Sequence, residues 1–193
     1  LRPQWRSWLV RGAVAITVYG GLLALHLAFS IAGWEQPQKW LAVAGLPAAA
    51  AAAGYTGYLF AQAKARDLWQ NPLLAPHLLV QAVMLGAAVM LPFAHWLAAG
   101  AVGPLEWLLG GMALAHLVVV AVETTLTHPT AHAHLATHEL TRGRYARFFR
   151  AGVLLAAAAV FAPLVGVAAV PLALAALLAH EHAYVQAGQA VPL

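Results

Sequence analysis

The sequence contains no cysteine and very little charge. None of its 193 residues is a cysteine, ten are basic and six are acidic. Because iron–sulfur clusters are held mainly by cysteine thiolates, we expect the chain itself to hold no such cluster. Charged residues make up 8% of the chain and hydrophobic residues 63%, whereas soluble domains are about a quarter charged and about half apolar. An ordinary soluble domain is therefore excluded.

Long apolar runs fill most of the sequence instead. They cover roughly residues 8–32, 40–63, 74–99 and 104–126, and a fifth stretch, 148–189, is long enough for two more. A helix needs about 20 apolar residues to cross a hydrocarbon core of about 30 Å. We therefore expect an all-α fold, a polytopic transmembrane helix bundle of about six spans, in which residues 1–193 form a single membrane domain.

Two features between and within these runs predict local structure. The longest polar stretch, 127–145, contains residues Ala131 to Leu140, which are suited to a short helix at the membrane interface. Gly166 and Pro171 mark a turn between the last two spans, because a single helix of about 40 residues would be about 60 Å long.

The basic residues gather on one side of the predicted spans. With six spans, nine of them share one face and only Lys39 lies at the other. The nine are Arg2, Arg6, Arg11, Lys64, Arg66, Arg142, Arg144, Arg147 and Arg150. Short loops rich in Lys and Arg stay on the cytoplasmic side, so we expect both termini of this segment in the cytoplasm and the protein in the inner (cytoplasmic) membrane. The basic excess then reflects topology and contact with membrane lipid, and no nucleic-acid partner is expected.

A tyrosine in the second run is the first candidate binding residue. Tyr55 stands in the run Gly54-Tyr55-Thr56-Gly57-Tyr58, and Gln62 follows it by seven residues, on the same face of a helix. A phenol inside a membrane needs a hydrogen-bond partner. The partner is either a quinone carbonyl or a neighbouring helix, in which case the glycines serve packing alone.

The motif around Tyr55 resembles the fourth-helix signature of the NrfD/PsrC family, the membrane subunits of polysulfide-reductase-type molybdoenzyme complexes. The matching residues are Gly54 to Leu59, Ala65-Arg66, Trp69 and Pro72-Leu73-Leu74, followed later by Glu123, His128-Pro129, Leu140, Gly143-Arg144-Tyr145, Phe149 and Tyr184 to Gln189. The resemblance implies a bundle that binds quinone and exchanges electrons with an iron–sulfur (ferredoxin-like) partner subunit. A molybdopterin-type catalytic subunit would complete the complex.

By the same resemblance, Tyr55 would be a ligand of ubiquinone or menaquinone. Thr56, Gln62 and His26 are the further candidate quinone contacts. The first predicted span would correspond to the family's third helix, so the sequence is expected to be the later part of a longer chain. The chain would be a quinone-reactive or non-catalytic subunit, and any molybdenum chemistry would lie in another subunit.

His116 and Glu123 form a candidate proton relay. They lie seven residues apart and so share one face of the fourth predicted span. A carboxylate inside a membrane is costly and usually functional, and quinone chemistry needs protons as well as electrons. The alternative is that Glu123 lies at the headgroup boundary and bonds the next loop.

The remaining histidines raise two rival readings. Paired histidines on different helices can ligate a b-type haem, and His26 with His116 is the best pair by depth, because His95, His77 and His180 are placed closer to the membrane surfaces. Lone membrane histidines are more often hydrogen-bonded core residues, so haem is not expected. A b-type cytochrome anchor, and a transporter or structural scaffold, remain the alternative functions.

Four histidines in the polar stretch, His128, His132, His134 and His138, suggest a metal site at first sight. They form two pairs with helical i,i+4 spacing, but on one continuous helix the two pairs would face different ways. A polar loop that touches a partner subunit is the alternative, and no metal site is expected.

Overall fold

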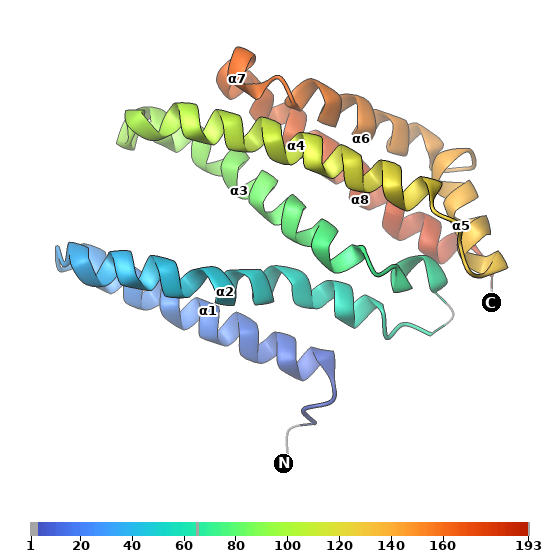
Figure 1. The fold of residues 1–193 in the computed structure, drawn as a ribbon, viewed down its shortest axis with the longest axis horizontal. Helices are drawn as coiled ribbons and strands as arrows, with labels where there is room; N and C mark the ends of the chain where they lie inside the picture. Colours follow the sequence, from blue (N-terminus) through green and yellow to red (C-terminus); the bar gives the residue numbers. More distant parts are fainter. Residues whose placement is uncertain (1–3, 65, 193) are drawn as a thin grey trace. The chain divides into compact units, whose positions relative to one another are not determined.

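The computed structural model describes residues 4–64 and 66–192, and every element in this part of the chain is a helix (Figure 1). Two residues used in the sequence arguments, Arg2 and Ala65, lie outside it. The elements are α1 (Trp8–Ile31), α2 (Glu35–Phe60), η1 (Asp67–Gln70), α3 (Leu74–Leu97), η2 (Ala99–Ala101), α4 (Val102–Thr125), α5 (Ala131–Thr141), α6 (Ala146–Ala159), α7 (Ala162–Val165), η3 (Gly166–Ala168) and α8 (Ala169–Ala190). The predicted all-α fold is confirmed.

The chain forms two compact units, unit 1 (Leu1–Gln62) and unit 2 (Ala63–Leu193). The single membrane domain expected from the sequence stays a prediction. Unit 1 holds α1 and α2, and unit 2 holds all the later helices.

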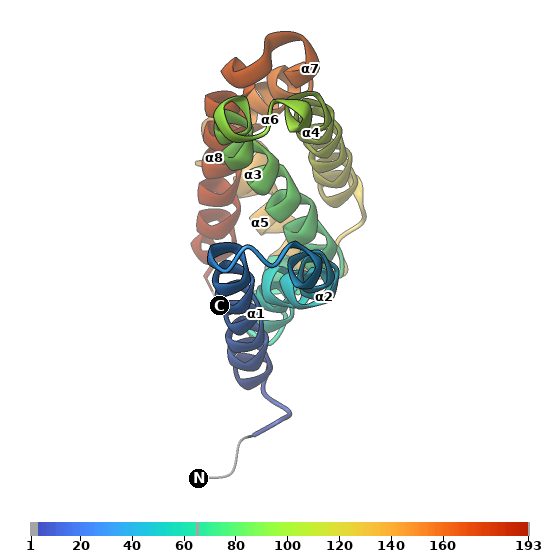
Figure 2. The same cartoon turned by 90° about the vertical axis from the view of Figure 1, so that its left-hand side faces the viewer.

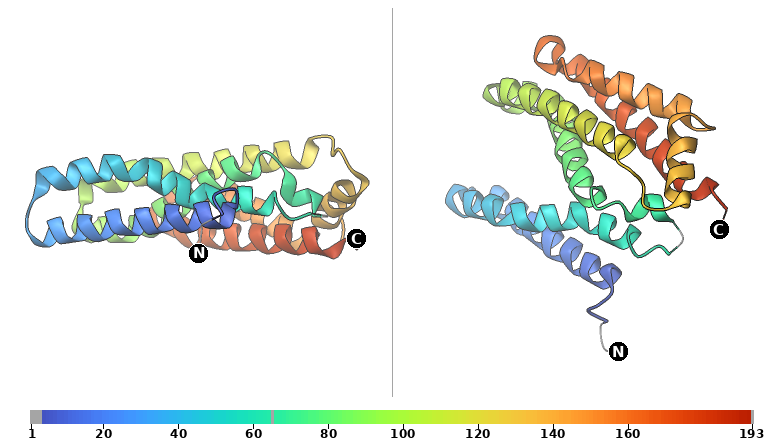
Figure 3. Two further views of the ribbon diagram at one scale, coloured as in Figure 1. Left: turned by 90° about the horizontal axis from the view of Figure 1, so that it is seen from below. Right: turned by 45° about the vertical axis from the view of Figure 1, so that its right-hand side comes forward.

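In unit 1, α1 and α2 run antiparallel and side by side (Figure 3). They are joined by a short turn in which Gly33 has a φ of 71°, in the left-handed region that favours glycine. The buried residues of the two helices are Gly12 on α1 and Gly54 and Gly57 on α2. Small residues let two helix backbones approach closely in a membrane, so glycines form the seam of this pair.

In unit 2, α3, α4, α6 and α8 pack around a core rich in alanine (Figure 2). The largest apolar side chains fully buried there are Met84, Leu91 and Leu109. A Cβ on Gly110 of α4 would lie only 2.6 Å from the carbonyl oxygen of Val160, at the end of α6. The two backbones therefore come into near contact at that point.

One end of unit 2 carries the turn that precedes α8. Gly166, between α7 and α8, has a φ of 59°, and Pro171 is the third residue of α8. The turn expected at Gly166 is therefore present, and Pro171 lies just inside the helix that follows it.

The opposite end of unit 2 is closed by η1 and α5, close to the C-terminus of the chain (Figure 1). The Arg66 Nη1 atom donates to the carbonyl oxygens of Gly188, Gln189 and Val191 at 3.1–3.3 Å. The Tyr184 hydroxyl of α8 donates to the carbonyl oxygen of Leu68 at 2.9 Å. These bonds attach η1 to the last turns of α8. The short helix expected at 131–140 is confirmed as α5.

Four segments are long and apolar enough to cross a membrane: Trp8–Ile31, Leu74–Leu97, Ala99–Thr125 and Ala162–Ala190. Their mean hydropathy is 1.9 to 2.3. Of the other expected spans, α2 has 26 residues but is rich in alanine and glycine, and α6 has 14 residues, which gives a length of about 21 Å. Four of the expected spans are therefore supported by length and composition, and the number six stays a prediction.

Candidate functional site

Tyr55 lies near the end of α2, with its ring against Gly12 of α1. A Cβ on Gly12 would lie 2.7 Å from Tyr55 Cγ and closer still to two other ring carbons, so only glycine leaves room for this ring. Tyr58, three residues further along α2, stacks on Trp8 with ring centroids 4.3 Å apart. The Tyr55 side chain is half-buried, and its hydroxyl forms no hydrogen bond with the described residues.

The other predicted quinone contacts do not all gather at Tyr55. Thr56 is its half-buried neighbour on α2. Gln62 is exposed and lies beyond the end of α2 at Phe60, so the shared helix face expected from its spacing does not form. His26 lies 14 residues beyond Gly12 on α1, about 21 Å further along the helix. Unit 1 therefore brings Tyr55 and Thr56 together and leaves His26 and Gln62 apart.

His26 lines a separate hollow between α1 and α2. The other residues around it are mainly apolar: Tyr19, Leu22, Leu23, Leu41, Ala42, Gly45, Leu46 and Ala49. The expectation that His26 contacts the same ligand as Tyr55 is not supported by this placement.

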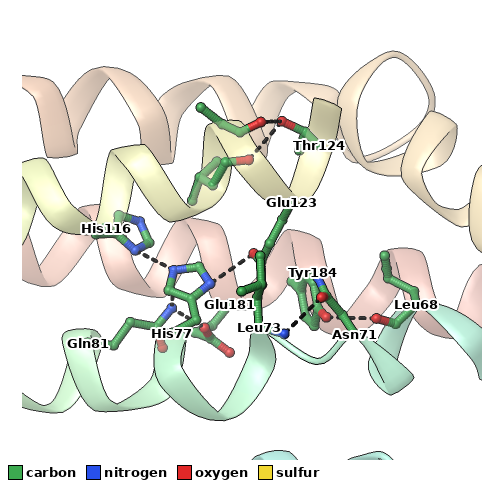
Figure 4. A network of polar contacts seen from close by, with 12 residues as sticks. Leu68, Asn71, Leu73, His77, Gln81, His116, Glu123, Thr124, Glu181 and Tyr184 are labelled. Carbon is green, nitrogen blue, oxygen red and sulfur yellow. Dashed lines mark hydrogen bonds and ion pairs between the residues drawn. The ribbon is translucent and has the colours of Figure 1, made fainter. Parts of the chain in front are cut away.

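In unit 2, His77, His116 and Glu123 form a buried hydrogen-bonded chain (Figure 4). The His77 Nδ1 atom lies 2.9 Å from Glu123 Oε2, and its Nε2 atom lies 2.8 Å from His116 Nδ1. All three side chains are at most 6% exposed. The predicted pair His116 and Glu123 is therefore joined through His77, which comes from α3.

The chain extends onto α8 through Gln81, one turn after His77. Gln81 Nε2 donates to Glu181 Oε1 at 2.8 Å and lies 3.4 Å from His77 Nε2 (Figure 4). A glutamine amide can thus hold a carboxylate of α8 next to the imidazole of α3. Three helices, α3, α4 and α8, position this network.

His180 of α8 completes a cluster of three imidazoles. Its ring centroid lies 5.3 Å from that of His77 and 4.9 Å from that of His116, and its ring stacks on Tyr184. The sequence-based depths placed His77 and His180 near the surface and His116 in the interior. That separation was wrong, because counting residues along each span ignores how far the helices are shifted past one another.

Two buried polar atoms of this cluster have no hydrogen-bond partner among the described residues, Glu123 Oε1 and His180 Nδ1. Glu123 and His180 both line a small, largely enclosed cavity with room for about one water molecule. Tyr184, Asn71 and Thr137 form part of its wall.

Three of the four loop histidines line one open, polar hollow at the α5 end of unit 2. They are His128, which precedes α5, and His134 and His138, which lie one turn apart on α5. His132 is not among the lining residues. Burial, and then the neighbouring His134 imidazole, lower the pKa of His128 below 6.5. In the described part of the chain, no group of three or more His, Asp or Glu side chains is arranged to hold a metal ion.

The family pattern described as "Polysulphide reductase, NrfD" matches residues 1–185. The chain belongs to the NrfD family. A relative from Halobacterium salinarum, named as a putative membrane subunit of dimethyl sulfoxide reductase, is 31% identical over 139 residues. The aligned part covers 66% of this chain and 32% of that protein, so it spans about a third of the relative's length. No solved structure matches.

Membership of the NrfD family confirms the resemblance drawn from the motif around Tyr55. Together with the four long apolar helices, it identifies the chain as an integral membrane protein.

The central member of the buried network in this NrfD-family chain, His77, was not among the predicted site residues, nor were its partners Gln81 and Glu181. The signals were present in the sequence. His77 and Gln81 are four residues apart and share a helix face, and Glu181 is an acidic residue within an apolar span, which is usually functional.

Of the pair favoured for the rival haem reading, His26 belongs to unit 1 and His116 to unit 2, and the haem reading stays an alternative. His116 Nδ1 is hydrogen-bonded to His77 Nε2. The cluster rings are only 4.9–5.3 Å apart between centroids, so no porphyrin fits between any two of them.

Proposed function

We propose that this chain is a quinone-interacting membrane subunit of an oxidoreductase complex. Family membership and the reductase membrane subunit among its relatives support this proposal. The chain exchanges electrons between membrane quinone and an iron–sulfur, ferredoxin-like partner subunit, beside a molybdopterin-type catalytic subunit. It resides in the cytoplasmic membrane, with both termini of this segment at the cytoplasmic face.

The observation that carries the quinone proposal is the phenol of Tyr55. It is half-buried on an apolar helix pair, its ring is held over Gly12, and its hydroxyl has no partner among the described residues. A phenol in such a place is a ready donor to an external acceptor. Tyr55 donates to a quinone carbonyl oxygen and orients the ring, and Thr56 borders the same contact.

A bound quinone takes up two electrons and two protons when it is reduced. The network of unit 2 carries protons, since its groups hydrogen-bond in series. With hydrogen on His77 Nε2, protonated Glu123 gives its proton to His77 Nδ1 while His77 Nε2 passes one to His116 Nδ1. His116 lies nine residues before the end of α4, about 14 Å from it, and Glu123 lies two residues before it. Protons therefore move inward from the α5 end.

Replacing Tyr55 with phenylalanine tests the quinone proposal. The Tyr55→Phe variant keeps the ring over Gly12 and removes only the hydroxyl. A neutral hydrogen bond contributes about 0.5–1.5 kcal/mol, so the KM for quinone should rise about 2- to 12-fold in quinone-coupled turnover of the purified complex.

Tyr58→Phe is the matched control, because the ring of Tyr58 stacks on Trp8 and its stacking survives the change. Both variants should assemble with their partner subunits. If Tyr55→Phe has the same KM for quinone as Tyr58→Phe, Tyr55 is not the quinone ligand.

A further inference from the structure

The hollow formed by the loop histidines has no role in the function proposed so far. It lies where α4 ends and α5 begins, and it is lined by His128, His134, His138 and Arg142, together with several threonines. Asp67 of η1 approaches the start of α5 and accepts a hydrogen bond from the Thr130 hydroxyl at 2.6 Å. Imidazoles at an open, polar surface can take up protons from water and release them near neutral pH.

Two threonines connect this open hollow with the buried cavity. Thr124 of α4 and Thr137 of α5 are lining residues of both. They are therefore the wall between the histidine-lined hollow and the cavity that contains Glu123 and His180. Their hydroxyls donate to backbone carbonyls, Thr124 to Val120 at 2.7 Å and Thr137 to Ala133 at 3.0 Å. To pass a proton on, such a hydroxyl accepts one at its oxygen and turns its own hydrogen from the carbonyl toward the cavity.

The cavity behind this wall meets the requirements for an ordered water. Its size suits about one water molecule. Two lining residues, Glu123 and His180, each present a buried polar atom with no hydrogen-bond partner among the described residues. A buried water bonds such otherwise unsatisfied groups in most proteins. One water here would extend the hydrogen-bonded series from the wall to the carboxylate of Glu123.

We propose that the hollow lined by His128, His134 and His138 is the proton entrance of the buried network. Protons leave bulk water at these imidazoles, pass the Thr124–Thr137 wall through the cavity water, and reach Glu123. This inference rests on the proposed relay from Glu123 through His77 to His116. No electron moves along the path and no covalent bond of the protein changes; each proton taken up leaves one hydroxide or buffer base outside.

The local chemistry of the entrance agrees with this role. His134 and His138 are exposed, so their imidazoles can exchange protons with solvent, whereas burial lowers the pKa of His128 and makes it the weaker proton acceptor. The entrance also lies at the correct end of the bundle. Glu123 is two residues from the end of α4, so the path from hollow to carboxylate is short while His116 lies deeper.

The experiment measures proton uptake and quinone reduction by the complete complex in liposomes, with a pH-sensitive dye in the medium facing the entrance. The entrance variant is His134→Ala combined with His138→Ala. Its control is His132→Ala, on the same helix but outside the hollow. A positioned proton donor raises the rate of a proton-transfer step by about 10²–10⁴-fold. Water can replace part of this rate gain, so proton uptake should slow about tenfold in the double variant and stay unchanged in the control.

Added imidazole distinguishes a loss of uptake caused at the entrance from one caused at the wall. Millimolar imidazole should restore uptake in the His134→Ala/His138→Ala variant, because it replaces the missing side chains in an open hollow. Thr137→Val keeps the side-chain volume and removes the hydroxyl behind the entrance. It should slow uptake in a way that imidazole does not restore, and it covers the case in which the double variant fails to assemble.

Glu123→Gln separates failure of this inference from failure of the relay. If Glu123→Gln stops uptake while the entrance and wall variants match His132→Ala, the entrance lies elsewhere and the relay stands. If Glu123→Gln leaves uptake and turnover unchanged, the proposed relay is wrong, and the proposed entrance, which depends on it, is wrong as well.

Discussion

A single methyl group on Gly12 should displace Tyr55 while leaving its hydroxyl intact. In the Gly12→Ala variant, the new Cβ would lie 2.7 Å from Tyr55 Cγ and nearer still to two other ring carbons. Ordinary carbon contacts begin at about 3.4 Å, so Cγ must move by about 0.7 Å and the two nearer ring carbons by more. Overpacking of this kind costs about 1–3 kcal/mol, set against a gain of about 0.5–1 kcal/mol from replacing a helical glycine with alanine.

Two measurements follow from that displacement. The α1–α2 pair should lose up to about 2.5 kcal/mol of stability, which is the cost of overpacking less the helical gain, and thermal unfolding of the purified complex detects the loss. The KM for quinone should also rise, because a shift of about 1 Å is enough to disturb a catalytic or binding geometry. Gly20→Ala is the control, since nothing lies within 4 Å of a Cβ at that position on the same helix. Equal stability and equal KM in the two variants would refute the contact between Tyr55 and Gly12.

Two further predictions test the packing of unit 2 and the topology. Gly110→Ala should destabilise unit 2 by about 1–3 kcal/mol, because its Cβ would meet the Val160 carbonyl oxygen. The control, Gly111→Ala, should not destabilise it, because nothing lies within 4 Å of a Cβ at that position. Equal melting temperatures of the two variants would contradict the close approach of α4 and α6. Because the chain has no cysteine, single cysteines report sidedness: Gly100→Cys should react with an impermeant maleimide from outside intact cells, and Arg144→Cys only after permeabilisation. Labelling of Arg144→Cys in intact cells would reverse the proposed orientation.

Much of the fold was predictable from the sequence, because apolar runs of membrane length leave few alternatives to helices. The turn at Gly166 and the short α5 followed from local signals, a glycine and a polar stretch. The division into two units was not predictable. It depends on which helix faces contact one another, and the alanine-rich sequence marks those faces only weakly.

The candidate site was predictable in part. The quinone contact at Tyr55, drawn from its motif, stays a prediction, while the spacing of His116 and Glu123 correctly put both in one buried network. Gln62 was misplaced because α2 ends at Phe60, before the two turns that a shared helix face requires. The role of His77 was missed because it joins residues 39 and 46 positions away in the sequence, and helical periodicity describes neighbours on one helix only.

The bonds of Arg66 impose an order on how unit 2 is built during synthesis. This guanidinium precedes α3 in the chain, yet its acceptors, the carbonyl oxygens of Gly188, Gln189 and Val191, are 122 to 125 residues later. The ribosome makes those acceptors after it has made α3, α4 and α6. The helices made before α8 therefore stay incompletely packed until α8 is in place. A factor that shields membrane helices during insertion is then needed longest at the helix faces that α8 covers.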